Sequence, residues 1–326
     1  MNQNKIQRWM STLLNQYGIY LMFLLLILVS TLLSDKFLTY KNIMSVSRQI
    51  SVTAVLAFGM TLLIISGGVD LSMGAVVALS GMFGINAYLE TESYIVAFLA
   101  ACAISVVCGY INGILVTKLM MPNFIATMAM DQICRGAVYI YTEGSPIYQI
   151  GELGKVSTTY VFSLIPLPVV IMLGVGVITH IILKYMRFGR SLYACGGNRE
   201  AAAASGINVG RTRRMAFVVS GIFVGIAAIL QMARLNSGLP DTANGYHADA
   251  IASAVIGGTS FTGGVGTAIG TLVGALIIGI ISNILNLLGV QSYVQQVVKG
   301  LIIIVAVSFD LLGKAKKIRK IRSEDK

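Results

Sequence analysis

Charge is scarce in this chain. Only 11% of its 326 residues are Asp, Glu, Lys or Arg, whereas a soluble domain usually carries about 25%. A further 56% are apolar, and they fall in long runs such as residues 18–33, 95–116 and 160–183. The sequence therefore predicts an all-α polytopic membrane protein, because lipid offers the backbone no hydrogen-bonding partner and helices satisfy their own.

Residue types that bind metals or perform catalysis are also rare. The four cysteines form no CxxC pair, and three of them lie in apolar runs, where cysteine behaves as a small hydrophobe. The only histidines, His180 and His247, are too few for most metal sites. Neither an HExxH metal motif nor a GxSxG nucleophile elbow is present, so we predict no metal and no catalytic residues.

A phosphate-binding loop is missing as well. The segment GELGKV (151–156) resembles one, but it lacks the first glycine and the Ser or Thr after the lysine. The chain therefore cannot itself cradle the phosphates of ATP. Acidic residues inside the apolar runs are few, whereas carriers driven by proton gradients often bury several of them.

Ten segments are candidates for membrane spans. Crossing ~30 Å of hydrocarbon takes about 20 helical residues. The third and eighth segments are rich in glycine and could be broken or re-entrant. The ten segments are residues 18–34, 49–66, 70–88, 95–117, 123–141, 160–183, 215–234, 249–262, 267–289 and 293–312.

Positive charge orients the predicted bundle. With the N-terminus in the cytoplasm, the segments on that side hold 17 Lys and Arg residues, whereas the opposite loops hold 4. Cytoplasmic loops carry such an excess, so both termini are predicted to be cytoplasmic. Residues 18–33 are interpreted as a retained first span, because no small-residue cleavage site of a signal peptide follows them.

Three regions follow from this pattern. Residues 1–17 are a cytoplasmic N-terminal segment, residues 18–312 are the transmembrane region, and residues 313–326 are a basic cytoplasmic tail. The tail is interpreted as a topology anchor near anionic lipid. The net charge of +11 follows from this asymmetry, so it does not indicate nucleic-acid binding.

The cytoplasmic loop 184–214 is an unusual polar interruption with seven Lys and Arg residues. Its segment NREAAAASG (198–206) predicts one short helix of strong helix formers, with Asn198 as N-cap, Glu200 in the first turn and Gly206 at the C-cap. One interpretation is an ordinary basic loop that only fixes topology. The uncharged alanine face and the flanking glycines favour a helix that inserts into a groove on a partner protein.

Four polar residues inside the predicted spans are candidates for a solute pathway. Asp131 and Arg135 lie four residues apart, so they share one helix face. They are interpreted either as a structural ion pair or as a polar wall of the pathway. In the second interpretation, Asn112 and Asn123 on neighbouring spans add hydrogen bonds to the hydroxyl groups of a neutral polyol.

Two glycine-rich stretches, GGVDLSMG (67–74) and GGTSFTGGVG (257–266), stand beside the two weak spans. Glycine permits a positive φ and close backbone approach. The stretches either pack helices tightly or let two half-bundles rock, as an inner gate on the cytoplasmic side. Asp70 is expected to cap the helix that follows the first stretch. The glycines concerned are Gly67, Gly68, Gly257 and Gly258.

The same stretches belong to a faint internal repeat. Residues 64–81 resemble residues 254–274, and GYINGIL (109–115) resembles GIISNIL (279–285). In the second copy, Ser260 and Thr262 could replace Asp70 as helix caps. Duplicated halves are common in transporters, although chance similarity among glycine-rich spans is the alternative.

Three longer stretches resemble a known family. They are LAFGMTLLIISGGVDLSMGAVVALSG (56–81), GRSLYACGGNREAAAASGINV (189–209) and DAIASAVIGGTSFTGGVGTAIGTLVGALIIGIISNILNLLGV (249–290). Over about residues 45–310, the chain is similar to the permease subunit of bacterial ribose-type ABC importers, within the branched-chain amino acid/monosaccharide permease superfamily.

This resemblance carries further expectations. It implies a type II importer architecture like that of the vitamin B12 importer, a second permease copy, an ABC ATPase subunit that binds the ATP, and an extracytoplasmic sugar-binding protein. It also implies a bacterial cytoplasmic membrane location and a small sugar, ribose or a related pentose, as solute. The resemblance assigns ATPase coupling to one segment, which comprises Gly196, Gly197, Asn198, Arg199, Glu200, Ala201, Ala202, Ala203, Ala204, Ser205, Gly206 and Ile207.

Two other classes of protein are alternatives to this expectation. A secondary transporter driven by an ion gradient would need no partner ATPase, and should have more intramembrane acids. A membrane-embedded enzyme would need catalytic residues that the sequence lacks. Copurification of an ATPase would separate the importer from the secondary transporter.

Overall fold

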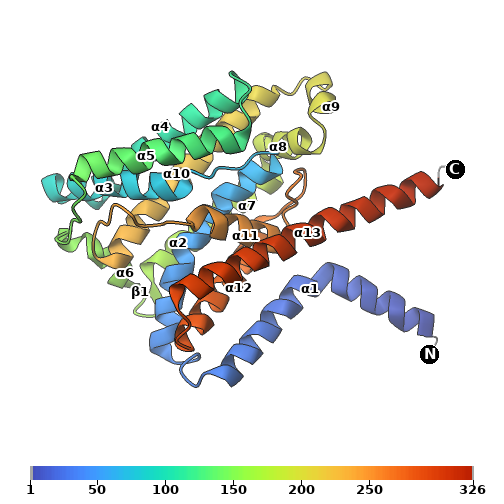
Figure 1. Ribbon diagram of the computed structural model, residues 1–326, viewed down its shortest axis with the longest axis horizontal. Helices are drawn as coiled ribbons and strands as arrows, with labels where there is room; N and C mark the ends of the chain where they lie inside the picture. The colour runs from blue at the N-terminus through green and yellow to red at the C-terminus, as the bar shows by residue number, and fades with distance from the viewer. Residues whose placement is uncertain (1–2, 325–326) are drawn as a thin grey trace.

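The computed structural model describes the backbone of residues 3–324, and the surroundings of the side chains of residues 18–308, 310 and 311. Helices dominate this part of the chain (Figure 1). The elements in chain order are α1 Gln3–Leu33, α2 Tyr40–Ile65, α3 Met73–Thr91, α4 Tyr94–Thr117, α5 Asn123–Thr142, the 3-10 helix η1 Gly151–Gly154, α6 Lys155–Thr158, β1 Tyr160–Val161, β2 Ile165–Pro166, α7 Leu167–Tyr185, α8 Arg187–Gly197, α9 Arg199–Ala204, α10 Val209–Leu235, α11 Tyr246–Ile256, α12 Ala268–Leu287 and α13 Ser292–Glu324.

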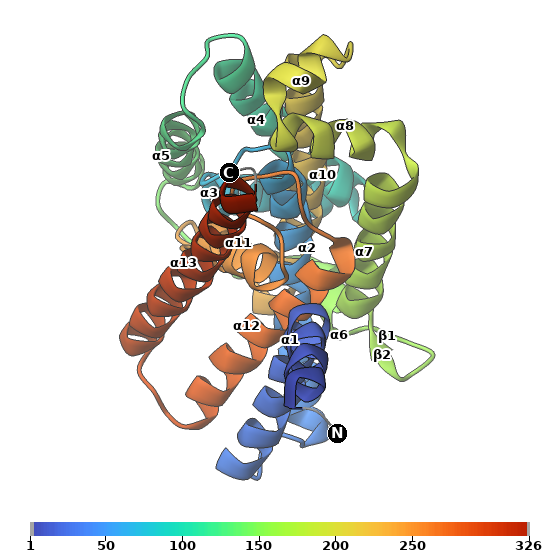
Figure 2. The ribbon, with the colours of Figure 1, turned by 90° about the vertical axis from the view of Figure 1, so that its right-hand side faces the viewer.

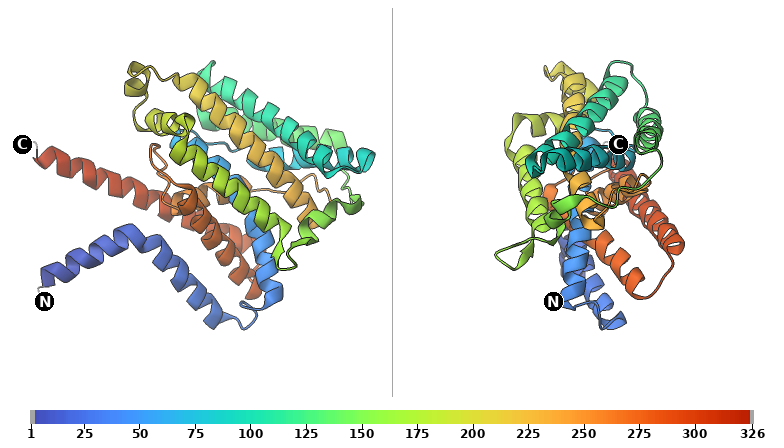
Figure 3. Two further views of the ribbon diagram at one scale, coloured as in Figure 1. Left: turned by 180° about the vertical axis from the view of Figure 1, so that it is seen from behind. Right: turned by 90° about the vertical axis from the view of Figure 1, so that its left-hand side faces the viewer.

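Helix α2 forms the centre of the bundle. Every residue from Ile50 to Ile65 is buried, and a helix that is apolar all round belongs in a core. It packs against α7, α10, α11 and α12. Figure 3 shows α3, α4, α5 and α10 lying along one another as one side of the bundle, in agreement with their mutual contacts.

Six helices in the described residues are long and apolar enough to cross a membrane: α2, α3, α4, α7, α10 and α12. The apolar parts of α1 and α13, Gly18–Leu33 and Ser292–Ser308, are shorter. The N-terminal part of α1 and the C-terminal part of α13 extend away from the rest of the bundle (Figure 1), whereas α1 also contacts α12 and α13 contacts α11. Side chains such as Leu24, Leu28 and Leu32 are exposed, as expected for a helix that faces lipid. The chain is therefore all-α with several membrane-spanning helices.

The predicted sixth span, 160–183, is wrong at its start. Strands β1 and β2 pair as an antiparallel hairpin, and α7 begins only at Leu167. Pro166 and Pro168 explain the difference, because proline disfavours helical backbone in the residue before it but is well suited to the first helical turn.

The predicted eighth span, 249–262, does not cross the membrane as a helix. Helix α11 has 11 residues, which span only about 16 Å, and residues 257–267 form a loop. Gly258 ends the helix at φ +84°, a left-handed conformation that favours glycine. This agrees with the alternative that the segment is broken. The third predicted span, 70–88, is instead one continuous helix that begins at Met73.

Candidate functional site

The loop 184–214 folds into two helices rather than the one that the sequence predicts. Helix α8 precedes α9 and buries Gly189, Leu192 and Cys195, a spacing that puts all three on one face. Burial raises the pKa of the Cys195 thiol, so the side chain acts as a small apolar group. Gly196 and Gly197, the glycines predicted to flank α9 on its N-terminal side, are the last two residues of α8.

The predicted caps of α9 are confirmed. The Oδ1 atom of Asn198 accepts a hydrogen bond of 3.0 Å from the backbone N–H of Ala201. At the other end, Gly206 has φ +81°, and the N–H of Ile207 donates to the carbonyl of Ala202, which is the usual pattern of a glycine C-cap. Ala202 is buried in the chain itself, whereas Ala201, Ala203 and Ala204 are exposed.

Three segments far apart in the sequence meet backbone to backbone at the end of α8. The N–H of Gly264 donates a 2.9 Å hydrogen bond to the carbonyl of Ile65. A Cβ added to Gly196 would lie 2.5 Å from the Gly264 nitrogen and closer still to the Ile65 oxygen. Cβ atoms added to Gly263 and Gly264 would lie 3.0 Å from the α8 backbone. We call this place the glycine junction: Ile65, Gly67, Gly196, Gly263 and Gly264.

The Gly67 carbonyl, just beyond the end of α2, accepts hydrogen bonds from side chains on three other helices. It accepts hydrogen bonds from Arg199 Nη2 (3.1 Å), Asn123 Nδ2 (3.2 Å) and Arg213 Nη2 (3.4 Å). Arg213 also donates to Asn123 Oδ1 at 2.9 Å. The C-terminal end of a helix carries a partial negative charge, so the two guanidinium groups stabilise the end of α2 and tie it to α9 and α10.

The glycines of the two stretches have different roles. Gly67 and Gly258 have positive φ, of +79° and +84°, as predicted. Gly257 instead allows close approach, because an added Cβ would lie 2.5 Å from the carbonyl carbon of Gly270 on α12. Gly68 has neither property, since its φ is not positive and an added Cβ would meet nothing nearer than 3.6 Å; its role in gating stays a prediction.

Both copies of the internal repeat end their helix with the same cap. The N–H groups of Gly67 and Gly68 donate to the carbonyls of Ile64 and Leu63. In the second copy, Gly258 and Thr259 donate to Val255 and Ala254 in the same pattern. By its place in the cap, Gly67 corresponds to Gly258. Aligning the two Gly-Gly pairs would instead match Gly67 to Gly257.

The predicted helix caps are wrong in the second stretch, and in the first stretch only the predicted hydrogen bond to the backbone forms, because the N-cap of α3 is Ser72 and not Asp70. Asp70 Oδ1 accepts hydrogen bonds from the Ser72 N–H at 2.9 Å and from the Ser72 hydroxyl at 2.5 Å. In the second stretch, Ser260 donates to Asp310 on α13 at 2.9 Å. The cap of α12 is instead Thr267, whose Oγ1 accepts from the Gly270 N–H at 3.0 Å.

Replacing Thr267 with alanine is expected to lower the free energy of unfolding by about 1 kcal/mol, because the start of α12 loses its side-chain acceptor. The thermal midpoint of the protein in detergent measures this loss. Thr267→Ser keeps the hydroxyl and should retain most of the stability. Equal midpoints for Thr267→Ala and the unaltered chain would contradict the assignment of the cap.

The four pathway candidates do not form one surface. Asn112 is fully buried and donates to Ser72 at 3.0 Å. Asn123 donates to the Gly67 carbonyl at the glycine junction. Arg135 donates to the carbonyls of Pro240 and Thr242, at 2.7 and 3.1 Å.

The predicted ion pair between Asp131 and Arg135 is wrong. Within the described residues, ion pairs join Glu152 to Lys155 and Asp249 to Lys299, and Asp131 takes part in neither. Neighbouring positions on a helix allow a salt bridge but do not require one. Arg135 is long enough to reach two carbonyls of the loop between α10 and α11, which satisfy its donors instead.

Comparison with known proteins decides the family. The model of the family described as branched-chain amino acid transport system / permease component matches residues 42–307. The chain belongs to this permease family. The permease is 40% identical over 305 residues to the ribose import permease protein of Bacillus subtilis, which covers 91% of this chain and 93% of that protein. It is 39% identical to the ribose import permease of Escherichia coli K12, over 91% and 94% of the two chains.

Relatives with other sugars in their names are nearly as similar to the permease. The D-allose transport system permease of Escherichia coli K12 is 37% identical, over 91% of this chain and 92% of that protein. The L-arabinose transport system permease of the same organism is 35% identical, over 91% and 90%. The permease is thus a multi-pass membrane protein of a transport family, a transport subunit rather than an enzyme.

An ion pair inside the permease was not expected from the sequence. Lys299 Nζ on α13 donates to Asp249 Oδ2 on α11 at 2.8 Å. Asp249 is buried, and Lys299 is half-buried. Charged residues within two predicted spans were the available signal, because a charge in a span needs a partner: Asp249 in 249–262, and Lys299 and Asp310 in 293–312.

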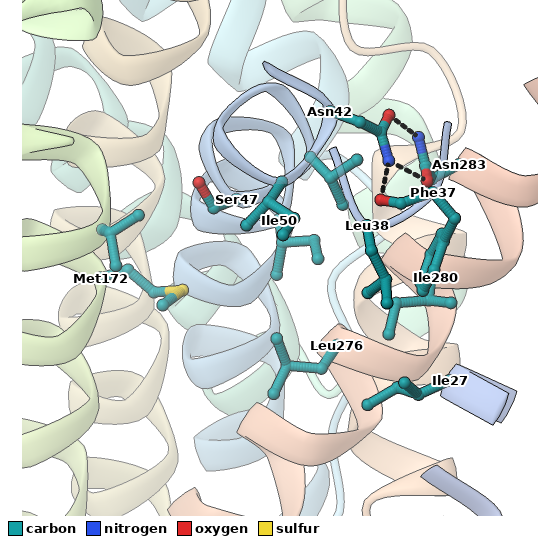
Figure 4. Close-up of a pocket in the computed structure, with 13 residues that line it drawn as sticks. Ile27, Phe37, Leu38, Asn42, Ser47, Ile50, Met172, Leu276, Ile280 and Asn283 are labelled. Carbon is teal, nitrogen blue, oxygen red and sulfur yellow. Dashed lines mark hydrogen bonds between the residues drawn. The ribbon is translucent and has the colours of Figure 1, made fainter. Parts of the chain in front are cut away.

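A cavity of about 300 Å³ between α1, α2, α7 and α12 is poorly suited to a polar solute (Figure 4). Its walls are mainly apolar side chains such as Ile50, Met172 and Leu276. The amides of Asn42 and Asn283 bond each other in both directions, at 3.0 and 2.9 Å. These amides tie α2 to α12 and leave little hydrogen-bonding capacity for a polar ligand.

Proposed function

We propose that the permease forms the membrane pathway of an ATP-driven importer for a small monosaccharide, ribose or a similar sugar. The observation that carries this proposal is the 35–40% identity, over about nine-tenths of each chain, to proteins named as ribose, allose and arabinose permeases. A conduit of this kind performs no chemistry of its own. Its energy comes from ATP, which a separate ABC ATPase subunit binds.

The segment Gly196–Ile207 is proposed to dock on that ATPase. Two features support it. Helix α9 exposes Ala201, Ala203 and Ala204 to solvent, so it offers a small uncharged face to a groove on a partner. Arg199 at the start of α9 holds the Gly67 carbonyl, so a force applied to α9 reaches the central helix α2 directly.

The remaining features of the proposed importer follow the family. We propose a type II architecture of about ten membrane segments in residues 18–312, of which the eighth is the short helix α11 and not a full span, with cytoplasmic segments at 1–17, 184–214 and 313–326. A second permease copy, an extracytoplasmic sugar-binding protein and the surrounding lipid are the other partners, in a bacterial cytoplasmic membrane with both termini inside. The contacts of Gly67 and Gly264 with α8 and α9 support an inner gate near the docking segment.

Uptake of radiolabelled ribose into proteoliposomes tests this function. The permease is reconstituted with its ATPase, with the binding protein and ribose outside and ATP inside. Uptake should require ATP and both partners. Uptake that continues without the ATPase and follows an imposed ion gradient would show that the permease is a secondary transporter.

Replacing Ala203 with tryptophan should separate ATP hydrolysis from uptake. Ala203 is exposed on α9, so the indole would obstruct docking without disturbing the bundle. We expect uptake to fall roughly tenfold, which corresponds to about 1.4 kcal/mol of lost coupling, with unchanged abundance in the membrane. Ala202 is buried, so Ala202→Trp should lower abundance as well.

A matched control places the same change far from α9. Phe162 at the tip of the β1–β2 hairpin is 95% exposed, and Phe162→Trp should leave uptake unchanged. Normal uptake by the Ala203→Trp variant would exclude this face of α9 from the docking surface.

A further inference from the structure

A second cavity, of about 530 Å³, lies where the start of α11 meets the first turns of α13. Its volume falls in the range of about 300–1,000 Å³ that is usual for small-molecule sites. Polar side chains line much of it: Asn244, Tyr246, Asp249, Gln295, Gln296 and Lys299.

The charges of this cavity cancel. Lys299 and Asp249 form the 2.8 Å ion pair, so the cavity offers no excess charge to an anion or a cation. Around the pair stand amide and hydroxyl groups, which both donate and accept hydrogen bonds. Such a lining suits a neutral molecule with many hydroxyl groups. By contrast, Asp310 is the one ionisable residue among otherwise apolar groups in the cavity between α12 and α13.

Two of the lining side chains are held in place by hydrogen bonds to residues that do not line the cavity. The Tyr246 hydroxyl accepts from Arg234 and donates to Gln231, both at 3.3 Å. Gln295 donates to Asn286 at 2.8 Å. Asn244 and Gln296 are instead exposed at the cavity. A fixed floor with adaptable polar side chains at its edge lowers the entropic cost of binding a small polar ligand.

The cavity and the glycine junction are joined by one short helix. Helix α11 begins at the cavity with Tyr246 and Asp249, and the loop that follows its last residue, Ile256, reaches the junction through Gly264. Figure 2 shows α11 in the middle of the molecule, between α2 and α13. A displacement at the cavity is thus carried along about 16 Å of rigid helix toward the segment proposed to dock on the ATPase.

From this arrangement we propose that the cavity is the sugar-contact site at the extracytoplasmic mouth of the pathway, with the Asp249–Lys299 pair as the charged part of its floor. The proposal rests on the proposed import function and adds a place for the sugar. It differs from the candidates of the sequence analysis, because none of Asn112, Asn123, Asp131 and Arg135 lines this cavity.

Protection of a cysteine from labelling tests the site. Gln296→Cys in the full transporter complex is exposed to a membrane-impermeant maleimide from outside, with ribose at high concentration or an equal osmolarity of betaine. We expect ribose to slow labelling about threefold or more and betaine to have no effect. Asn244→Cys, on the opposite wall, provides a second reporter if the first variant folds poorly.

Two controls make the result specific. Cys108, Cys134 and Cys195 are buried and Cys102 is half-buried, so the unaltered chain supplies the background. Phe162→Cys on the exposed hairpin should label equally with and without ribose. If allose or arabinose protects the cavity and ribose does not, the monosaccharide class stands and the particular sugar changes.

The outcomes separate this inference from the import function. If the unaltered complex imports ribose with ATP but neither reporter is protected by any of the three sugars, the cavity is not the sugar-contact site. Failure of both reporters to label from outside would also overturn it, because the cavity would then not open to that side. Absence of ATP-driven uptake of these sugars by the unaltered complex would instead count against the import function itself.

Discussion

The Gly196→Ala variant is expected to lose at least about nine-tenths of ATP-driven uptake. The added methyl group would lie 2.5 Å from the Gly264 nitrogen and closer still to the Ile65 oxygen. Both neighbours are backbone atoms that cannot turn away, and overpacking of this kind costs about 1–3 kcal/mol. The 2.9 Å hydrogen bond from Gly264 to Ile65 would have to break, which opens the glycine junction.

The neighbouring glycine provides the matched control. A Cβ added to Gly197 meets nothing within 4 Å, and both glycines lie in the last turn of α8. Gly197→Ala should therefore keep its uptake and its thermal midpoint in detergent, whereas Gly196→Ala should lower both. Equal behaviour of the two variants would show that the backbones do not meet at Gly196.

The Asp249→Ala variant should be depleted from the membrane. It leaves the Lys299 ammonium group half-buried without its 2.8 Å partner, and breaking a buried pair in this way costs about 3–5 kcal/mol. That loss is a large share of the stability of a typical domain, about 5–15 kcal/mol. Immunoblotting of membranes and the thermal midpoint in detergent measure it.

Two further variants isolate the cause. Replacing both partners with apolar residues, Asp249→Leu with Lys299→Met, removes the unpaired charge and should restore most of the abundance. Asp131→Ala removes an acid that forms no ion pair within the described residues, so it leaves no buried cation without an ion-pair partner and should cost less stability than Asp249→Ala. A larger loss for Asp131→Ala than for Asp249→Ala would reverse our assignment of the structural pair.

Properties that depend on neighbours along the chain could be read from the sequence. Apolar runs predict membrane helices, because each residue is transferred into lipid with its own backbone bonds already made. The caps of α9 at Asn198 and Gly206 are also local, since a cap bonds residues two to five positions away. For the same reason Asp70 was correctly expected to bind the backbone two residues on.

Properties that depend on partners far along the chain were decided by the tertiary structure. Asp249 and Lys299 are fifty residues apart, and no periodicity joins them, whereas the helical spacing of Asp131 and Arg135 suggested a pair that does not form. The need for glycine at position 196 arises from the Ile65 and Gly264 backbones, which lie in two other segments. Long-range packing of this kind is fixed by shape and hydrogen bonding in three dimensions, so composition and local spacing determine that the chain is a helical membrane protein, and only the packed bundle determines which of its polar residues and glycines meet.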